Sequence, residues 1–264
     1  MKLSVITINY NNIAGLEKTI DSVVSQTMHD FEWIVIDGGS TDGSKEIIEQ
    51  NKQYFDCWCS EPDKGIYQAM NKGILASHGE YLMFLNSGDS LYDNKVLERV
   101  VPLLNDKDIY VGRINSIGRE NASDEEQADF SPEGIIRKLT FTWIPHQASF
   151  FKRTFFDTYG LYREDQKIVS DWWAFYKSLV IGDATIDSLP LIVSHYDIEG
   201  VSATHRSLAM QEQENLLRDH PSIEVYYNFY RDNLDIVTAL KKNNILFMLF
   251  RVYFYFYRRF SNNK

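Results

Sequence analysis

The sequence predicts an α/β protein with a mainly parallel central sheet, helices on both faces of that sheet and a C-terminal helical extension. In about the first 110 residues, short apolar segments alternate with segments of helical period, as in chains that build parallel sheets. From Thr204 onward the pattern is helical, with a break at Pro221. Because 44% of the 264 residues are hydrophobic and 24% are charged, the chain can bury a sizeable core.

Each element of the first half follows from a local pattern. Strands are expected where apolar runs are bounded by turn residues, at Leu3–Asn9, Trp33–Asp37, Cys57–Ser60, Glu80–Asn86 and Asp108–Gly112. Helices are expected where apolar residues recur every three or four positions, at Gly15–Gln26, from Thr41 or Asp42 to about Lys52, at Ile66–Ala76 and near Val96–Leu104. Thr41 or Asp42 is suited to cap the second helix.

The pattern beyond residue 112 is less regular. Strands are expected at Gln147–Lys152 and Leu189–His195, with a helix from about Asp171 to Val180 between them. The segment Ser116–Ser131 is polar and rich in acidic residues, which is typical of a surface loop.

Charge is unevenly distributed along the chain. The formal net charge is -10, which argues against a nucleic acid partner because that affinity comes mainly from Lys and Arg. Residues 241–264 nevertheless contain six basic residues and no acidic one, together with eight aromatic residues between Ile245 and Phe260. Such a split is typical of an appendage that binds a surface.

The sequence gives no sign of export. The apolar N-terminal stretch ends at once in Asn9, so it does not resemble a signal peptide. No apolar run reaches the roughly 18 residues that a membrane-spanning helix needs. Cys57 and Cys59 are expected to be reduced thiols in the core. We therefore expect a cytoplasmic protein.

Polar residues follow four consecutive predicted strands. They are Thr7 and Asn9 on the first, Asp37 on the second, the run Ser60–Gly65 after the third and the run Asn86–Asp89 after the fourth. Any one of them alone is better explained as a cap or turn residue. Together they indicate a ligand site, because ligands of open α/β sheets bind beyond the carboxyl ends of the strands.

The acidic residues in this set limit which classes of ligand the site can bind. They would repel a bare phosphate, so they either accept hydrogen bonds from ribose and base or hold a divalent cation that bridges to a diphosphate. Neither G-x-G-x-x-G after the first strand nor G-x-x-x-x-G-K-[ST] anywhere is present. A Rossmann dehydrogenase and a P-loop NTPase are therefore poor fits, and a mononucleotide-diphosphate carrier remains.

Four motifs carry a family resemblance. The segments SVITINYNN, WIVIDGGSTDGS, SEPDKGIYQAMNKGI and YLMFLNSGD, in this order and spacing, resemble family-2 glycosyltransferases with the GT-A fold, of the bacterial type that builds cell-surface polysaccharide. The resemblance is strong over residues 1–112, weaker over 140–205 and absent beyond. It implies a GT-A domain at 1–203, with a nucleotide-binding half at 1–112 and an acceptor half at 113–203, followed by a helical region at 204–264.

The resemblance assigns donor and metal residues by position. For the nucleotide-sugar donor it implies Thr7, Asn9, Asp37, Asp63, Lys64, Asn71 and Asn86. Where the family often has D-x-D-D, this chain has Asn86-Ser87-Gly88-Asp89, so Asp89 remains as ligand for Mg²⁺ or Mn²⁺. Asp197 or His195 is expected to supply a second ligand.

On the acceptor side the resemblance implies Asp171 as the base that takes the proton from the acceptor hydroxyl. The alternative is a helix N-terminal acid stabilised by the helix dipole. His146 and Gln147 match a segment that borders the acceptor. Trp172 would serve as a sugar platform, although a tryptophan in an apolar helix is more often part of the core. Direct displacement with one base implies inversion at the anomeric carbon.

The C-terminal region is expected to contain a basic, aromatic, amphipathic helix at 244–260. Asn244, Arg251 and Arg258 share one helical face, with Arg259 beside them. This pattern suits the interface of an anionic membrane, which would place the protein peripherally on the inner face of the cell membrane, near a polyprenyl-linked acceptor. The alternatives are packing on its own domain or against a second subunit in a homodimer.

These observations predict a metal-dependent, inverting glycosyltransferase that moves a sugar from a nucleotide diphosphate, UDP being favoured, to a glycan or lipid-linked glycan. One alternative is a nucleotidyltransferase that makes sugar nucleotides, although its Gly-rich basic loop is absent. A second is a non-catalytic scaffold that binds sugar nucleotides, suggested by the missing D-x-D acids.

Overall fold

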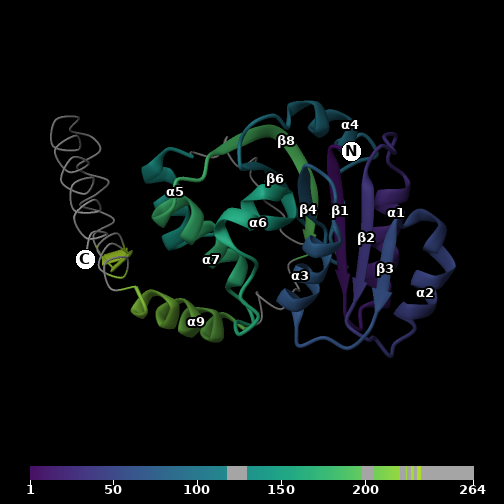
Figure 1. Ribbon diagram of the computed structural model, residues 1–264, viewed down its shortest axis with the longest axis horizontal. Helices are drawn as coiled ribbons and strands as arrows, with labels where there is room; N and C mark the ends of the chain where they lie inside the picture. Colours follow the sequence, from purple (N-terminus) through teal and green to yellow (C-terminus); the bar gives the residue numbers. More distant parts are fainter. Residues whose placement is uncertain (118–129, 198–204, 221–223, 225–226, 229–230, 233–264) are drawn as a thin grey trace.

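The computed structural model describes residues 1–117, 130–197, 205–220, 224, 227–228 and 231–232. One sheet of eight strands runs through it in the order β3-β2-β1-β4-β7-β6-β8-β5 (Figure 1). The strands are β1 (Leu3–Asn9), β2 (Glu32–Asp37), β3 (Cys57–Ser60), β4 (Tyr81–Phe84), β5 (Ser90–Leu91), β6 (Ile109–Ile117), β7 (Ser149–Lys152) and β8 (Ile186–Asp197).

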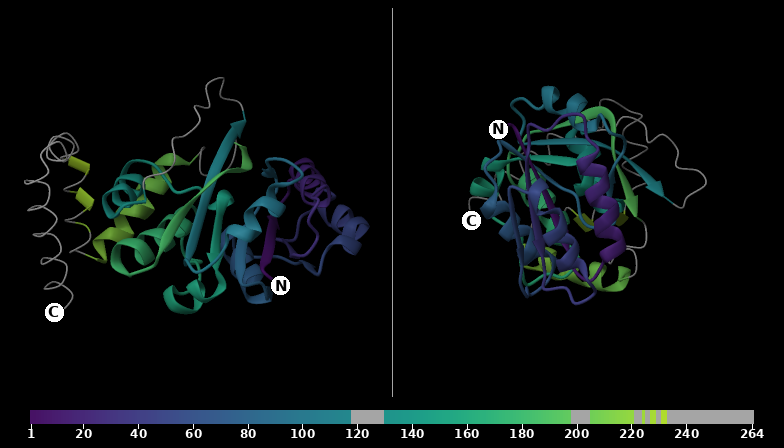
Figure 2. Two further views of the ribbon diagram at one scale, coloured as in Figure 1. Left: turned by 90° about the horizontal axis from the view of Figure 1, so that it is seen from above. Right: turned by 90° about the vertical axis from the view of Figure 1, so that its right-hand side faces the viewer.

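The sheet has a parallel N-terminal half. Strands β3, β2, β1 and β4 are parallel neighbours, while β7 runs antiparallel to both β4 and β6. Strand β8 is parallel to β6 and antiparallel to β5. Figure 2 shows the N-terminal half in purple to blue beside the later half in teal to green, and the single sheet joins them. The predicted fold class is confirmed.

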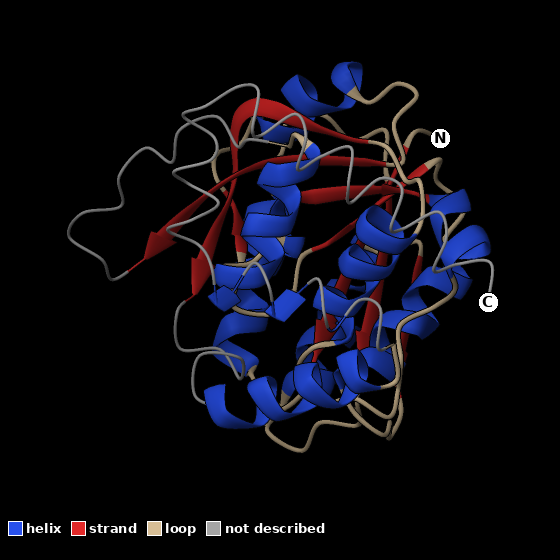
Figure 3. Ribbon diagram, turned by 90° about the vertical axis from the view of Figure 1, so that its left-hand side faces the viewer, coloured by secondary structure: helices blue, strands red, loops and turns tan. Residues whose placement is uncertain are grey.

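Helices cover both faces of the sheet. They are α1 (Ile13–Val24), α2 (Ser44–Asn51), α3 (Ile66–Ala76), α4 (Val96–Val100), α5 (Pro132–Phe141), α6 (Arg153–Tyr159), α7 (Ser170–Tyr176) and α9 (Arg206–Arg218). Strand β1 divides its apolar side chains by parity, as a pleated strand must. Leu3 and Val5 pack in one core with α1, α2 and α4, whereas Ile6 and Ile8 pack in the other with α3, α5, α6, α7 and α9. Figure 3 shows the helices in blue packed around the strands in red.

Several boundaries differ from the sequence prediction. Strand β6 continues to Ile117 and therefore includes the start of the expected Ser116–Ser131 loop, of which 118–129 lie outside the described residues. Strand β8 begins three residues before Leu189 and pairs with β6, which stabilises the added length. Strand β5 and helix α6 had no periodic pattern long enough to reveal them, whereas α5 was missed although Ser131 and Pro132 mark its start and Ile135 and Leu139 lie one turn apart.

The predicted cap of α2 is wrong. The helix begins after Gly43, whose φ of 100° lies in the left-handed region that favours glycine. Asp42 instead accepts hydrogen bonds from the backbone N–H groups of Ile13 (2.9 Å) and Ser44 (3.1 Å), which tie this turn to the start of α1.

The thiols also differ from expectation. Both cysteines are free, as predicted, but Cys57 is exposed and Cys59 is half-buried, because β3 is the edge strand of the sheet. The segments around Pro221 and at 244–260 lie outside the described residues. Among the residues described, no helix is long and apolar enough to cross a bilayer.

Candidate active site

The carboxyl ends of β1, β2 and β3 meet at Asp37. The strand register places Asn9 and Ser60 on either side of it. One carboxylate oxygen accepts from Asn9 Nδ2 (2.8 Å) and Ser40 Oγ (2.6 Å), and the other accepts from Ser60 Oγ (2.7 Å) and the Ser40 N–H (2.9 Å). Burial alone would raise the pKa of Asp37, but these hydrogen bonds outweigh it and lower the pKa. Asp37 is therefore a buried, charged anchor.

Two side chains, Asn9 and Tyr10, lie beside this anchor. Asn9 Oδ1 is buried and has no hydrogen-bond partner within the described part of the chain. Tyr10, which directly follows β1, is 66% exposed. A side chain on Gly38 would meet Tyr10 Cδ2 at 3.2 Å and Asp63 Oδ2 at 2.7 Å, so the glycine allows these groups to converge over the strand end. Lys64 follows Asp63 with its side chain exposed.

The loop after β4 is held by the first helix. Thr19 Oγ1 of α1 lies 2.6 Å from the Asp89 carbonyl oxygen, the nearest acceptor for its single hydrogen, and it accepts from the Gly88 N–H (3.1 Å). Lys18 Nζ donates to the Gly88 carbonyl at 2.7 Å. Helix α1 thereby fixes the backbone that carries Asn86 and Asp89, and the Asp89 side chain is buried there.

Asp171 lies at the start of α7, in a hydrogen-bonded chain that reaches this loop. One of its carboxylate oxygens accepts from Tyr67 Oη of α3 at 2.9 Å, and the other lies 3.2 Å from His146 Nδ1. The opposite ring nitrogen of His146, Nε2, is 3.3 Å from Asn86 Nδ2. Four segments that are distant in the sequence are thus joined, and the predicted base is connected to the predicted donor loop.

The electrostatics of these hydrogen-bonded residues favour an ion pair between Asp171 and His146. Burial would raise the pKa of Asp171, but the hydrogen bond and charge of His146 and the hydroxyl of Tyr67 lower it. Burial would lower the pKa of His146, yet its contact with Asp171 raises it, with a further contribution from the charge of Asp89. The pKa of the Tyr67 hydroxyl is raised well above its usual value by burial and by Asp171.

Four of the predicted residues have their polar groups inside the protein. Thr7 Oγ1 accepts from Trp33 Nε1 at 3.1 Å within the core. Asn71 bonds both backbone groups of Tyr162, donating to its carbonyl (2.9 Å) and accepting from its N–H (3.0 Å). Gln147 is buried, and its Oε1 has no partner among the described residues.

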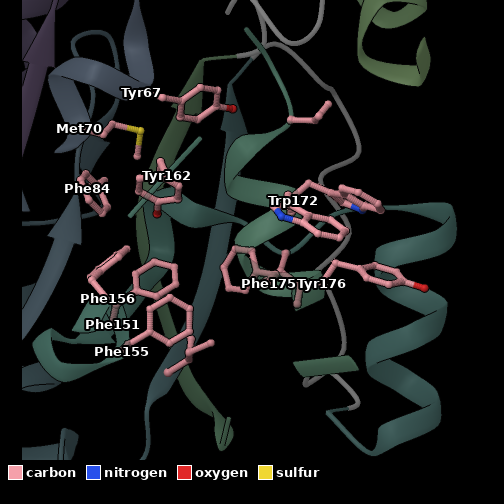
Figure 4. Packing of buried hydrophobic residues seen from close by; sticks show 14 of the residues in the cluster. Tyr67, Met70, Phe84, Phe151, Phe155, Phe156, Tyr162, Trp172, Phe175 and Tyr176 are labelled. Carbon is pink, nitrogen blue, oxygen red and sulfur yellow. The ribbon is translucent and has the colours of Figure 1, made fainter. Parts of the chain in front are cut away.

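Trp172 is the fourth. Its indole donates to the Leu139 carbonyl at 2.7 Å, and the side chain is 6% exposed. Figure 4 shows it within the aromatic core, beside Phe175 and Tyr176 of the same helix. This position matches a core residue rather than a sugar platform.

Comparison with known proteins identifies the family. A model described as glycosyl transferase family 2 matches residues 4–164, which is more than half of the chain. The chain belongs to glycosyl transferase family 2. The family that the four motifs predicted is confirmed.

Bacterial relatives agree with this assignment. A PGL/p-HBAD biosynthesis glycosyltransferase of Mycobacterium bovis is 32% identical to this family-2 glycosyltransferase over 186 residues, covering 64% of this chain and 66% of that protein. The match therefore spans just under two thirds of that relative's length. An uncharacterised glycosyltransferase of Mycobacterium tuberculosis is 31% identical over 207 residues, covering 77% and 78% of the two chains.

Solved structures agree on the fold. TarS 1-349 of S. aureus in complex with UDP superposes with a TM-score of 0.63 at 20% identity, covering 75% of this chain and 60% of that fragment. A mannosyltransferase, PcManGT from Pyrobaculum calidifontis, in complex with GDP-Man and Mn²⁺, has a TM-score of 0.56 at 17% identity, covering 74% and 56%. The GT-A fold expected for this family-2 glycosyltransferase is confirmed.

The two candidates for a second metal ligand differ in their surroundings. Both ring nitrogens of His195 face protein groups, Asn115 Nδ2 and the Tyr92 carbonyl, each at 3.2 Å. The backbone of Asp197 ends β8, and its side chain lies outside the described residues. In the part of the chain that the structure describes, no group of three or more His, Cys, Asp or Glu side chains could hold a metal ion.

Sequence reasoning missed Tyr10 and Tyr67 and placed His146 only near the acceptor. Tyr10 lies inside the first family motif, and its position directly after a buried strand was an available signal. Tyr67 gave no such signal, because it reads as one more apolar residue on the buried face of α3.

Proposed function

We propose that this chain transfers a sugar from a nucleotide-diphosphate donor, with UDP favoured, to a glycan or lipid-linked glycan acceptor in surface polysaccharide synthesis. The observation that carries the proposal is the hydrogen-bonded chain from Asp171 through His146 to Asn86. It connects a carboxylate suited to general-base chemistry with the carboxyl-end edge of the sheet, where donors bind in α/β folds. The TarS complexes with UDP and with UDP-GlcNAc support a nucleotide-sugar donor.

The donor site of the proposal centres on Asp37. Asn9 presents a buried, unpartnered oxygen that suits an N–H donor of the base or a ribose hydroxyl, and Tyr10 offers an exposed ring for stacking on the base. Asp63 and Lys64 border the same edge. Asp37 keeps its charge and orients the Asn9 amide from behind.

A divalent cation, Mg²⁺ or Mn²⁺, fits the Asp89 loop in its donor chemistry. Mg²⁺ is typically held by one or two carboxylates together with substrate phosphates, and Asp89 supplies one carboxylate at the correct edge of the sheet. Asp197 stays the candidate for a second ligand, since both nitrogens of His195 are engaged. When bound, the cation would act as a Lewis acid for the departing diphosphate. The complex of PcManGT with Mn²⁺ supports this assignment.

Asp171 is the base of the proposal. It accepts the proton of the acceptor hydroxyl as that oxygen attacks the anomeric carbon, and a single displacement inverts the configuration there. The lowered pKa of Asp171 keeps it ionised at neutral pH, as a base must be. Its position between Tyr67 and His146 fixes the orientation of the carboxylate.

The acceptor of the proposal is carried by a lipid at the inner face of the cell membrane. The net positive, aromatic-rich segment 241–264 supports this placement, since anionic lipids attract such sequences. A homodimer through the same segment is the alternative. The relative from Mycobacterium bovis, named for PGL/p-HBAD biosynthesis, supports a role in cell-envelope synthesis.

A thermal-shift panel tests the donor. UDP-, GDP- and dTDP-sugars are each added with and without Mn²⁺, and we expect one UDP-sugar to raise the melting temperature most, and more so with the metal. Release of UDP from that donor then separates an enzyme from a scaffold. Stabilisation with no turnover in the presence of membrane extract would support the scaffold, and no stabilisation by any sugar nucleotide would refute the proposal.

A further inference from the structure

The residues behind Asn86 determine which way its side-chain amide points. Asp171 is ionised, because its pKa is lowered, and an ionised carboxylate can only accept hydrogen bonds. His146 Nδ1, 3.2 Å from Asp171 Oδ2, therefore carries a proton. In the neutral ring this is the single N–H, so Nε2 is an acceptor. Its neighbour at 3.3 Å is Asn86 Nδ2, which donates to it.

This orientation turns the amide oxygen of Asn86 away from the imidazole. Asn86 Oδ1 is buried and has no hydrogen-bond partner among the residues that the structure describes. Asn9 Oδ1, at the end of the neighbouring strand β1, is in the same state. A buried acceptor without a donor is unfavourable, so two such oxygens at adjacent strand ends indicate a ligand that donates hydrogen bonds to them.

The connections of Asn86 indicate which part of the donor it faces. Through His146 it is joined to Asp171, the proposed base, which acts beside the anomeric carbon. Three positions further along the same loop is Asp89, the proposed ligand of the cation that holds the diphosphate. The transferred sugar lies between the acceptor oxygen and the diphosphate, and Asn86 is the residue linked to both sides.

Resting on the function proposed above, we infer that Asn86 Oδ1 accepts a hydrogen bond from an O–H or N–H group of the transferred sugar. His146 is the positioning residue that turns this oxygen toward the sugar. It passes the polarity of the Asp171 carboxylate through the ring, since an acceptor at Nδ1 makes Nε2 an acceptor in turn. One ionised acid thereby aligns both the proposed base and a contact to the donor.

Protonation of the ring reverses the amide. Nε2 would then carry a proton as well, and Asn86 Oδ1 would turn to accept it. Asp171 of α7 faces the ring at Nδ1, Asp89 of the loop after β4 acts through its charge, and Tyr67 of α3 reaches it through Asp171. The two acids raise the pKa of His146, so the oxygen faces the sugar only above this raised value.

One experiment needs no donor. Ring-nitrogen NMR of the full chain labelled with ¹⁵N-histidine, with the His146 signals assigned by His146→Phe, shows the pH above which the ring is neutral and which nitrogen then carries the proton. We expect the proton on Nδ1. The Nε2 signal should shift in Asn86→Ala, because Nε2 loses the hydrogen bond that it accepts. A neutral ring with its proton on Nε2 would overturn the inference.

A second experiment measures affinity for two probes at a pH where the ring is neutral. Isothermal titration compares UDP with the sugar nucleotide that stabilises the protein most, both with Mn²⁺. In Asn86→Ala we expect the sugar nucleotide to bind about 3- to 10-fold more weakly, the order of one neutral hydrogen bond, and UDP to bind as in wild type. Equal losses for the two probes would place Asn86 on the nucleotide or the cation and overturn the inference.

A double-mutant cycle tests the positioning role of His146. His146→Phe keeps a ring of similar size but frees the amide, so we expect it to weaken binding of the sugar nucleotide and not of UDP. In the Asn86→Ala background it should have no further effect. A merely structural role would instead make the two losses additive, which would overturn the inference. His29→Phe, at an exposed histidine between α1 and β2, is the matched control and should bind both probes as wild type does.

Failure of the proposed function gives a different result. In that case no sugar nucleotide would bind to the wild type, and the inference would fail with it. Failure of the inference alone leaves the sugar nucleotide bound, with a loss in Asn86→Ala that is absent or equal for UDP.

Discussion

A carboxylate keeps its charge inside a protein when hydrogen-bond donors replace the water that it loses. Asp37 and Asp171 both do so, in different ways. Asp37 is surrounded by neutral donors from the carboxyl ends of neighbouring strands, so its charge stabilises the local structure. Asp171 is held by one tyrosine and one titratable histidine from other elements. Of these two acids, only Asp171 has a partner that titrates near neutral pH.

Asp171→Asn tests the base directly. The amide is nearly isosteric but cannot accept a proton, so we expect kcat to fall by about 10²-fold or more while the donor dissociation constant changes little. Nucleotide release and isothermal titration with the donor measure the two quantities. Asp157→Asn, an exposed acid on α6, is the control and should behave as wild type. Unchanged turnover in Asp171→Asn would remove this residue from the mechanism.

At the residue scale, the sequence predicts site residues best where a polar side chain directly ends an apolar strand. Asn9 and Asp37 were predictable because they end apolar strands, and the polar groups of both lie at the site. Thr7 is two residues further inside the same strand, on the same face as Asn9, and its depth within the strand places it in the core against Trp33. Tyr67 was not predictable, because its partner Asp171 lies 104 positions away.

Helix α1 covers the sheet and also supports the loop that follows β4. Its first two turns hold the Asn86–Asp89 loop through the Thr19 hydroxyl and the Lys18 ammonium, and its N-cap residue Asn12 donates from its amide to the Ser87 carbonyl at 3.1 Å. The Ser87 N–H also donates to the Ile8 carbonyl of β1, and the Asp89 N–H donates to the Asn86 carbonyl, each at 3.0 Å. Helix α1 is thus one of the supports that set the geometry of Asp89.

Thr19→Val measures this dependence. The methyl group fills the same space but leaves the buried backbone oxygen of Asp89 without its donor, so we expect the free energy of unfolding to fall by about 1–3 kcal/mol. The stabilisation that Mn²⁺ adds in the presence of donor should fall as well. Urea denaturation and thermal shift measure the two effects. Thr19→Ser keeps the hydroxyl and should lie close to wild type, and equal losses in both variants would contradict this role.

A polar cluster at the amino-terminal ends of β1 and β2, the ends away from Asp37, predicts that the stability of the fold depends on pH. Glu32 of β2 accepts from Ser4 Oγ (2.6 Å) and from the His78 N–H (2.7 Å), and it pairs with the His78 ring at 2.8 Å. Burial would raise the pKa of Glu32, but these bonds outweigh it and lower the pKa. A lowered pKa stabilises the fold above the unfolded pKa, and this contribution disappears as pH falls through the folded value.

Glu32→Gln should therefore destabilise the protein by about 2 kcal/mol at pH 7, the order of a hydrogen bond to a charged group. The difference from wild type should shrink as pH falls through the lowered pKa of Glu32, below the ordinary range of a glutamate. Urea denaturation at pH 7 and at an acid pH below that range measures it. Glu80→Gln, which breaks the exposed pair with Lys2, is the control and should cost at most about 1 kcal/mol at either pH. A pH-independent loss in Glu32→Gln would contradict the prediction.

At the scale of the whole molecule, one sheet brings two different halves together. Strands β1–β4 carry the residues of the proposed nucleotide side, while the segment around His146 and helix α7 carry those of the proposed acceptor side. Strand β7 lies between β4 and β6 and thus attaches the second half directly to the first. His146 immediately precedes β7 in the chain, so this strand pairing sets the distance from His146 to Asn86.

Binding to a membrane surface is a property of the whole chain, and it is predicted from the basic residues of the C-terminal segment. Full-length protein should float with phosphatidylglycerol vesicles, while a chain ending at Lys242 should not, because the deleted residues contain four of the basic side chains and the aromatic run. Flotation in a density gradient measures binding. Replacing Arg251, Arg258 and Arg259 by Gln in the full chain is the matched control and should weaken binding. Equal flotation of the full and shortened chains would contradict the prediction.

The amino-acid sequence by itself determined the order of strands and helices in the first half, because period and turn chemistry are local and the apolar runs are unambiguous. It also determined the polar strand ends, since each follows its strand within one or two residues. Only the tertiary structure decided which polar groups face the site and which face the core. That choice depends on strand register and on contacts between residues about 60 to 100 positions apart, such as Asn86 with His146 and Tyr67 with Asp171, which no local pattern encodes.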